Sequence, residues 1–412
     1  MRLRVIICAM TITSKKAMVA AMEACCEEPQ GAAPRAAGRD AAKLLGLVFL
    51  VFGAQVALLL AAKLFHWGGH PSWIWVQVTD LAFFRDGARV WLSAGNPYGI
   101  NGFVTPPPSL LFSAPLAALH RPLADHAFIF ANVLLLVWSL RRYAAAVGLA
   151  LREQMLFLLA ATIFYSTQES VREGNLDVLM LALLVLAFTT RDSSRGAVAL
   201  GASFGAKFYS ALFLPVMLRF RQWRSLGVAV LTFCLLLLPF HRIWIPAYHA
   251  LIFRGGRFRS ISIAPASLVY PLLGGNAKIE SLATMLLYEL VAITFLVALI
   301  RDRSQRPSPR TLGRYAPWML AMPSLVFSYV GVQALPVLAV LLEAARRRPL
   351  RRSEWCTLAG FLLLGIHAET IVCALPVAFD TFQFWRMHAA MIQSAGVVLM
   401  IVGSCLTPVP RS

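Results

Sequence analysis

Charged and amide side chains stand at the ends of several apolar segments of this chain. Ionisable groups are costly to keep at membrane depth, so such residues are candidates for function. Acidic side chains are scarce, with 19 Asp and Glu among 412 residues, yet several fall in stretches that we predict to share one face. The candidates are Asp80 and Asp86, then Glu169, Glu173, Asn175 and Asp177, and finally Lys207 with Arg254, Arg257 and Arg259.

The basic members of this set are suited to binding an anion. Lys207 lies between two short apolar stretches with little other charge nearby, which favours anion binding over a side chain that merely extends to the interface. The sequence Arg254-Gly-Gly-Arg257-Phe-Arg259 places three guanidinium groups beside two flexible glycines. Arginine grips phosphate in bidentate fashion, and the same stretch equally fits a solvated or lipid-headgroup patch.

Asp80 begins an amphipathic segment that runs to Ala94. Four apolar residues recur there at helical spacing, and the sequence Gly95-Asn96-Pro97 ends the pattern. An Asp in this position is either an N-cap or a reactive carboxylate. The two roles are compatible, because a cap also fixes the direction in which the carboxylate points.

The composition identifies the solvent around these residues. Hydrophobic residues make up 59% of the chain and charged residues 14%, with a mean hydropathy of +0.69. A soluble domain carries about 25% charged residues, so a soluble globular protein is excluded. We predict an all-α polytopic membrane protein. The apolar runs near the length that crosses a bilayer are Leu44–Leu64, Ser225–Phe240, Ala283–Ile300, Trp355–Val377 and Met391–Leu406.

The formal net charge of +19 fits the same interpretation. The basic residues occur in short clusters between apolar runs, which is the pattern that marks the cytoplasmic side of membrane helices. We therefore expect no nucleic-acid partner. The seven Cys show no metal-binding spacing, and those in or beside apolar helices are read as buried thiols.

Placing all basic clusters on one side predicts the topology. It requires about ten to twelve membrane segments, including two hairpins of short helices, residues 195–219 with Lys207 at the apex and residues 315–342. Residues 65–123 would form a first outer-face loop that carries interfacial helices. Residues 1–43 would be a flexible cytoplasmic tail, and residues 44–407 the integral membrane domain.

Three blocks of the sequence form a recognisable series. The first runs from Asp80 to Asn96-Pro97-Tyr98 and continues into Thr105-Pro-Pro-Pro before an apolar helix. The second is Glu169-Ser170 followed by Gly-Asn175-Leu-Asp177, and the third is Gly201-Ala-Ser-Phe-Gly-Ala-Lys207-Phe-Tyr with a basic segment at 219–224. In order and spacing these blocks, over about residues 75 to 230, resemble the GT-C glycosyltransferases of family 87.

The chain departs from the family pattern at three positions. Asn175 stands where the family has Gln, Asp177 where it has Asn, and Phe208 where it has Pro. A downstream Ser-Pro and aromatic element of the family is echoed only loosely at Pro323-Ser324 and Ser328-Tyr329. These departures bear on the identity of the donor and on activity.

The resemblance implies a GT-C-like bundle and an inverting transfer. A mannose-like hexose or a pentose would pass from a polyprenyl-phosphate donor to a glycolipid or polysaccharide of the cell envelope. Asp80 would be the general base, and Lys207 with one or more of Arg254, Arg257 and Arg259 would hold the leaving phosphate. The site would face the periplasm or outside of a bacterial inner membrane.

Two alternatives stay open at this point, a flippase or transporter for lipid-linked saccharides and a non-catalytic membrane scaffold. Broken helices and charges at mid-depth serve transport as well as transfer, but a transporter is expected to show related halves, which this hydropathy pattern lacks. The sequence shows no dense carboxylate cluster at metal spacing, so we expect no metal and no cofactor other than the donor substrate.

Overall fold

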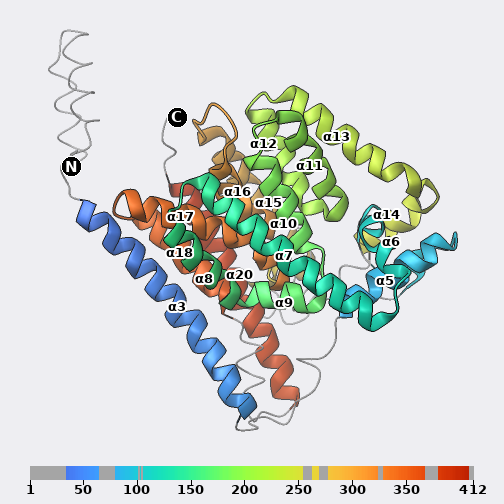
Figure 1. Cartoon of the computed structure of the whole chain (residues 1–412), viewed down its shortest axis with the longest axis horizontal. Helices are drawn as coiled ribbons and strands as arrows, with labels where there is room; N and C mark the ends of the chain where they lie inside the picture. The colour runs from blue at the N-terminus through green and yellow to red at the C-terminus, as the bar shows by residue number, and fades with distance from the viewer. Residues whose placement is uncertain are drawn as a thin grey trace.

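The computed structural model describes residues 34–64, 79–100, 103, 105–253, 262–268, 277–322, 328–366 and 379–407. Within these ranges every regular element is a helix, which confirms the predicted all-α class (Figure 1). The α-helices are α3 (Pro34–Leu64), α5 (Thr79–Leu92), α6 (Ser109–Ala117), α7 (Arg121–Val147), α8 (Leu151–Ile163), α9 (Tyr165–Glu173), α10 (Asp177–Thr189), α11 (Ser193–Ala206), α12 (Phe213–Arg219), α13 (Trp223–Leu237), α14 (Trp244–Phe253), α15 (Ala277–Arg301), α16 (Pro309–Ala321), α17 (Leu335–Arg347), α18 (Arg352–Gly365) and α20 (Phe379–Leu406).

Among the described residues, five helical stretches are long and apolar enough to cross a membrane. They are Arg39–Leu58, Arg121–Val147, Trp223–Ala250, Ile279–Arg301 and Tyr329–Arg347, and shorter apolar helices cover Asp177–Thr189, Phe208–Arg219 and Ala390–Leu406. Large apolar side chains such as Phe130, Leu231 and Ile293 are exposed on the long helices. Such surfaces suit a lipid environment, and the chain is a multi-pass membrane protein.

The predicted boundaries agree with the helices in part. Helix α3 begins at Pro34, so the last ten residues of the segment predicted as a tail are helical, and residues 1–33 lie outside the described part. The predicted span Trp355–Val377 corresponds to α18, which ends at Gly365, and residues 367–378 are not described.

Both predicted short-helix segments are broken helices in the structure. Helix α11 ends at Ala206, Lys207 adopts an extended backbone conformation with φ −154°, and the 3-10 helix η2 (Phe208–Leu212) leads into α12. In the second segment, α16 is followed by the 3-10 helix η7 (Ser328–Ala334) and then α17. At the break, the Lys207 backbone N–H donates to the Ser203 carbonyl and its carbonyl accepts from the Ser210 hydroxyl, so both backbone groups are satisfied within an otherwise apolar region.

Two helices, α5 and α6, occupy the described part of the stretch predicted to be a first outer-face loop. Helix α5 buries Leu81, Phe84 and Ala88 along one face, as the helical spacing indicated. After the 3-10 helix η1 (Pro97–Gly99), the Tyr98 hydroxyl donates a 2.7 Å hydrogen bond to the Thr105 carbonyl and closes the turn before α6. Phe84, Ala88 and Tyr98 belong to a small apolar core that is separate from the main one.

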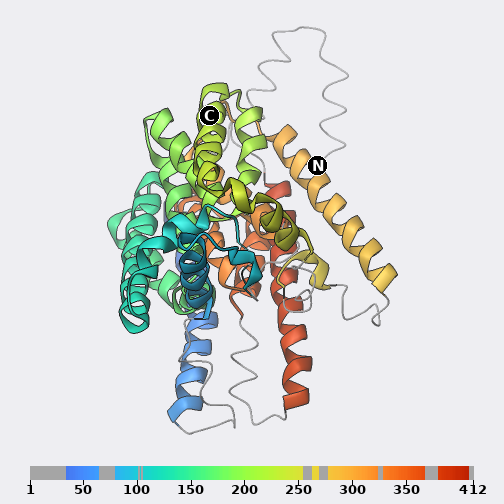
Figure 2. The ribbon, with the colours of Figure 1, turned by 90° about the vertical axis from the view of Figure 1, so that its right-hand side faces the viewer.

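Helices α5, α6 and α14 gather at one end of the molecule, beside the end of α13, whereas α3 lies at the opposite edge (Figures 1 and 2). The ring centroids of Trp91 on α5 and Phe240 in the 3-10 helix η3 (Leu238–Ile243) are 4.6 Å apart, which ties this group to the end of α13.

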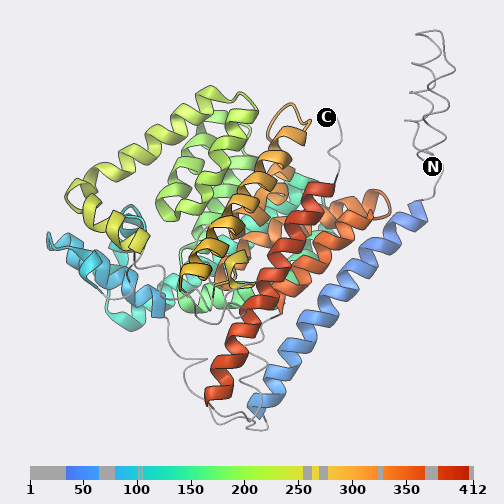
Figure 3. The ribbon, with the colours of Figure 1, turned by 180° about the vertical axis from the view of Figure 1, so that it is seen from behind.

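Close helix crossings in the bundle depend on glycine. A Cβ at Gly360 of α18 would lie 2.5 Å from the Gly396 carbonyl of α20, so a side chain cannot be accommodated there without separating the helices. Viewed from behind, α20 runs through the bundle between α15 and α18 (Figure 3).

Candidate active site

Asp80 and Asn175 meet although 95 residues separate them along the chain. The Asn175 Nδ2 donates a hydrogen bond of 2.5 Å to Asp80 Oδ2. Asp80 is in the first turn of α5, where the positive end of the helix dipole favours a carboxylate. Its side chain is partly exposed, whereas Asn175 is buried. The carboxylate predicted as a general base is therefore held in place and remains accessible.

The turn between α9 and α10 sets the direction of Asn175. Gly174 has φ +70°, a left-handed conformation that glycine adopts at little cost, and it ends α9. The Asn175 Oδ1 then accepts a 2.8 Å hydrogen bond from the Leu176 backbone N–H. Because its oxygen is occupied in this way, the amide nitrogen faces Asp80.

Lys207 and Asp177 form a buried ion pair beside this turn. The Lys207 Nζ lies 3.0 Å from Asp177 Oδ2, and the two side chains are 6% and 0% exposed. Asp177 opens α10, and its backbone carbonyl accepts a 2.7 Å hydrogen bond from Gln333. A buried ion pair contributes little net stability, so its retention in an apolar region suggests a role in function.

Two tyrosines complete the cluster. The Lys207 ammonium lies 5.5 Å from the Tyr209 ring centroid and 5.2 Å from that of Tyr329. Tyr209 also hydrogen-bonds to Lys207, and the Tyr329 side chain hydrogen-bonds to Asp80. Sequence reasoning did not select either tyrosine, although both occur in the quoted motifs, because nothing in the sequence brings η7 next to η2.

The surroundings of Asp80 change its acidity. Helix α5 lies outside the membrane-spanning segments, and burial raises the pKa of the Asp80 carboxyl from 3.8 to about 6. The nearby Lys207 charge lowers this pKa, Glu173 raises it, and the hydrogen bonds from Asn175 and Tyr329 lower it. A carboxylate with a pKa near 6 is largely ionised at neutral pH and is a better proton acceptor than an ordinary aspartate.

The other two acidic candidates of the second stretch lie next to this cluster. Glu173, at the end of α9, is close enough to influence Asp80 and also pairs with Arg172 at 2.7 Å. Glu169 is 8% exposed, one turn earlier on α9, and its charge acts on Arg172 and Tyr329. Both therefore border the site that contains Asp80.

Asp86 is not part of this cluster. Its side chain is 51% exposed and pairs with Arg85 at 3.8 Å and with Arg89 at 3.9 Å. Six helical residues correspond to a rotation of about 240°, so Asp80 and Asp86 point in different directions from α5. The helical phase of the two residues would have revealed this from the sequence.

Arg85 is a further residue that sequence reasoning did not select as a site residue. It is 6% exposed, and its Nε and Nη1 have no hydrogen-bond partner in the described part of the chain. Among the described residues, its ion-pair partner is the exposed Asp86, at 3.8 Å. A buried guanidinium left this incompletely paired is costly, which makes Arg85 a candidate ligand for an anionic group.

Three predicted phosphate ligands, Arg254, Arg257 and Arg259, lie outside the described residues. Over the described ranges, no group of three or more His, Cys, Asp or Glu side chains is placed to hold a metal ion. The site is thus built from one partly exposed carboxylate, a buried cation with its counterion, two tyrosines and an amide.

Comparison with known proteins identifies one related family. The model of glycosyltransferase family 87 matches residues 103–249, a segment that includes Asn175, Asp177, Lys207 and Tyr209. Asp80 lies before the matched segment and Tyr329 after it. No curated protein matches the chain. The match confirms the resemblance that the three sequence blocks indicated: over residues 103–249 the chain resembles glycosyltransferase family 87.

Proposed function

We propose that this protein is a glycosyltransferase that uses a polyprenyl-phosphate sugar as donor and transfers a mannose-like hexose or a pentose with inversion. The acceptor would be a hydroxyl of a glycolipid or polysaccharide in the cell envelope. The observation that carries the proposal is the Asp80 carboxylate, which is accessible, fixed by Asn175 and shifted to a pKa of about 6.

In the proposed reaction, the acceptor oxygen attacks the anomeric carbon of the donor sugar. The bond between that carbon and the phosphate oxygen breaks, and polyprenyl phosphate leaves with the bonding electrons. Asp80 takes the proton of the acceptor hydroxyl as the new glycosidic bond forms. Attack opposite the leaving group inverts the configuration at the anomeric carbon.

The cations of the site would stabilise the negative charge that develops on the departing phosphate. Lys207 supplies a positive charge next to Asp80, although its ammonium is already paired with Asp177. Arg85, on the same helix as Asp80 but turned about 140° from it, has guanidinium nitrogens without partners in the described residues and would contact a phosphate bound on that face of α5. Arg254, Arg257 and Arg259 remain candidates for the same role.

We also propose which side of the membrane the site faces and which cofactors the reaction needs. The site would face the periplasm or outside of a bacterial inner membrane, because the basic clusters predict the opposite ends of the helices to be cytoplasmic. No metal and no cofactor beyond the donor is proposed to take part, since the general base and the cations supply the proton transfer and the charge stabilisation.

The test compares the wild type with Asp80→Asn, both purified and reconstituted with radiolabelled polyprenyl-phosphate mannose and a lipid extract of the host. We expect label in a new glycolipid with the wild type and at least about 100-fold slower transfer with Asp80→Asn, the usual scale for loss of a general base. Asp86→Asn, on the same helix but exposed, is the matched control and should retain transfer.

Equal transfer by the wild type and Asp80→Asn would remove Asp80 as the base. Absence of transfer by both proteins with mannose and pentose donors alike, together with movement of the lipid-linked sugar across sealed vesicles, would replace the proposal with the flippase alternative. The anomeric configuration of the product, determined by NMR, must be opposite to that of the donor.

A further inference from the structure

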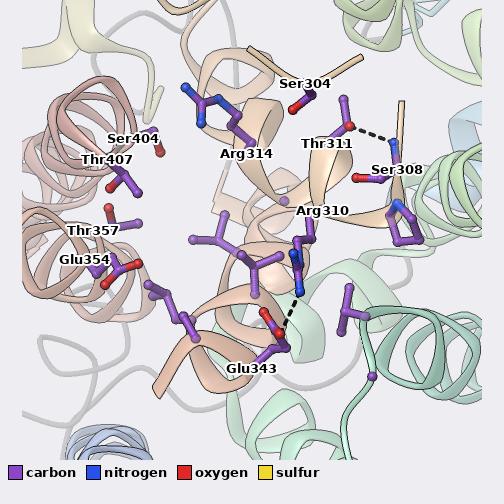
Figure 4. A pocket seen from close by; sticks show the side chains of 18 of the residues that line it. Ser304, Ser308, Arg310, Thr311, Arg314, Glu343, Glu354, Thr357, Ser404 and Thr407 are labelled. Carbon is purple, nitrogen blue, oxygen red and sulfur yellow. Dashed lines mark hydrogen bonds and ion pairs between the residues drawn. The ribbon is translucent and has the colours of Figure 1, made fainter. Parts of the chain in front are cut away.

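A second site lies at the other end of the bundle from Asp80. An open cavity of about 620 Å³ is lined by the end of α7, the start of α16, the end of α17, the start of α18 and the end of α20 (Figure 4). This volume is within the range of about 300–1,000 Å³ that small-molecule sites occupy. Neither the family match nor the proposed transfer assigns a role to it.

The length of α10 separates this cavity from the Asp80 cluster. Asp177 at the start of α10 belongs to that cluster, whereas Thr189 at its end accepts a 2.7 Å hydrogen bond from Arg142 Nε. Arg142 is near the end of α7, and Gly148, which caps α7, lines the cavity. Thirteen helical residues span about 20 Å, so the two sites are distinct.

The lining of the cavity carries more positive than negative charge. Five arginines and three carboxylates line it, which leaves an excess of two positive charges. The arginines are Arg306, Arg310, Arg314, Arg347 and Arg348, and the carboxylates are Asp302, Glu343 and Glu354. The basic-cluster pattern predicts this end to be cytoplasmic. That pattern requires basic loops, but it does not require them to surround a cavity.

The excess positive charge of the cavity lining can be assigned to particular arginines. Arg310 Nη2 lies 2.7 Å from Glu343 Oε1, and Arg347 pairs with the same oxygen, so one carboxylate serves two guanidinium groups. Arg306 is exposed and makes no hydrogen bond or ion pair within the described residues. Arg314 and Arg348, by contrast, each have a carboxylate partner, at 3.6 Å and 2.6 Å.

Neutral donors surround the same cavity. Ser404 is 8% exposed, lines the cavity, and its hydroxyl makes no hydrogen bond in the described part of the chain. Ser304 and Ser308 stand beside Arg310 and Arg314 (Figure 4), and Ser308 precedes the first turn of α16. A helix start, serine hydroxyls and arginines together form the donor set that phosphate oxygens require.

We propose that this cavity binds a phosphate-bearing anion from the side predicted to be cytoplasmic. The phosphate would contact Arg306 and Arg310, with Ser304 and Ser308 as hydroxyl donors, and would balance the two excess positive charges. The chemistry is shared by an anionic lipid headgroup and a free phosphate compound. Basic pockets between membrane helices on the cytoplasmic side are suited to lipid headgroups.

The test uses the full chain purified in a neutral detergent. Binding of dioleoyl phosphatidate in mixed micelles and of inorganic pyrophosphate is measured by thermophoresis for the wild type, Arg306→Gln, Arg310→Gln and Arg303→Gln. Arg303 is exposed, three residues from Arg306 and absent from the cavity lining, so Arg303→Gln is the matched control. Thermal unfolding of each variant confirms that it is folded.

We expect Arg306→Gln and Arg310→Gln each to weaken binding about tenfold or more, the scale of a hydrogen bond to a charged group, and Arg303→Gln to leave it unchanged. Binding of phosphatidate identifies a lipid headgroup as the source, and binding of pyrophosphate alone identifies a free phosphate compound. Failure of both probes to bind, or equal binding by the wild type and both cavity variants, would overturn the proposal. An equal loss in Arg303→Gln would do the same.

Discussion

The rate of sugar transfer should follow the ionisation of Asp80. Burial raises the pKa of this carboxyl to about 6, and a general base acts only when it is deprotonated. Between pH 5 and pH 7 the deprotonated fraction rises from about one-tenth to about nine-tenths, so the rate should rise about tenfold and then level off. With its ordinary pKa of 3.8, the same residue would be about nine-tenths ionised at pH 5 and the rate would hardly change.

The assay measures kcat/KM for the acceptor between pH 4.5 and pH 8, because this quantity reports the pKa of the free enzyme. Two variants test whether the midpoint of this pH profile belongs to Asp80. Glu173→Gln should move the midpoint to lower pH, since the charge of Glu173 raises the pKa of Asp80, and Asp86→Asn should leave the midpoint in place. A rate that is flat between pH 5 and pH 7, or an upward shift of the midpoint in Glu173→Gln, would refute the reasoning.

Two further predictions concern the cations. Lys207→Met should lower the free energy of unfolding by about 3–5 kcal/mol, because it leaves the fully buried Asp177 carboxylate unpaired. The double variant Lys207→Met with Asp177→Asn should recover most of that stability without recovering transfer. Thermal unfolding and the transfer assay check both expectations, and a stable single variant would contradict the first. Arg85→Met should reduce kcat/KM for the donor at least about tenfold while leaving the unfolding temperature unchanged or higher, whereas a loss of stability with unchanged transfer would assign Arg85 a structural role.

Several features of this protein follow from the sequence itself. The all-α membrane class depends on the length and hydrophobicity of apolar runs, which are local properties of the chain. The amphipathic helix after Asp80 and the break at Lys207 were likewise predictable, because helical periodicity and the positions of charges reveal them without reference to the rest of the fold. The resemblance in the three sequence blocks identified Asp80, Asn175 and Lys207 as candidates together.

The assembly of the site depended on tertiary structure. Asn175 reaches Asp80 across 95 residues, and Tyr329 reaches it from η7, in the second half of the chain. Such contacts between distant residues depend on how helices cross and on close glycine contacts such as that of Gly360 with Gly396, which no local sequence pattern encodes.

The partners of charged residues also depended on tertiary structure. The sequence presented Asp177 and Lys207 as separate candidates, but the fold buries them as a pair and leaves Asp80 partly exposed. Helical phase places Arg85 on the same face of α5 as Leu81 and Ala88, but only the fold shows that two of its nitrogens have no partner among the described residues, and that arginines from α16 and α17 line a cavity. Residue types and helical phase are fixed by the chain, whereas burial, ionic partners and acidity arise only when distant helices pack and exclude water.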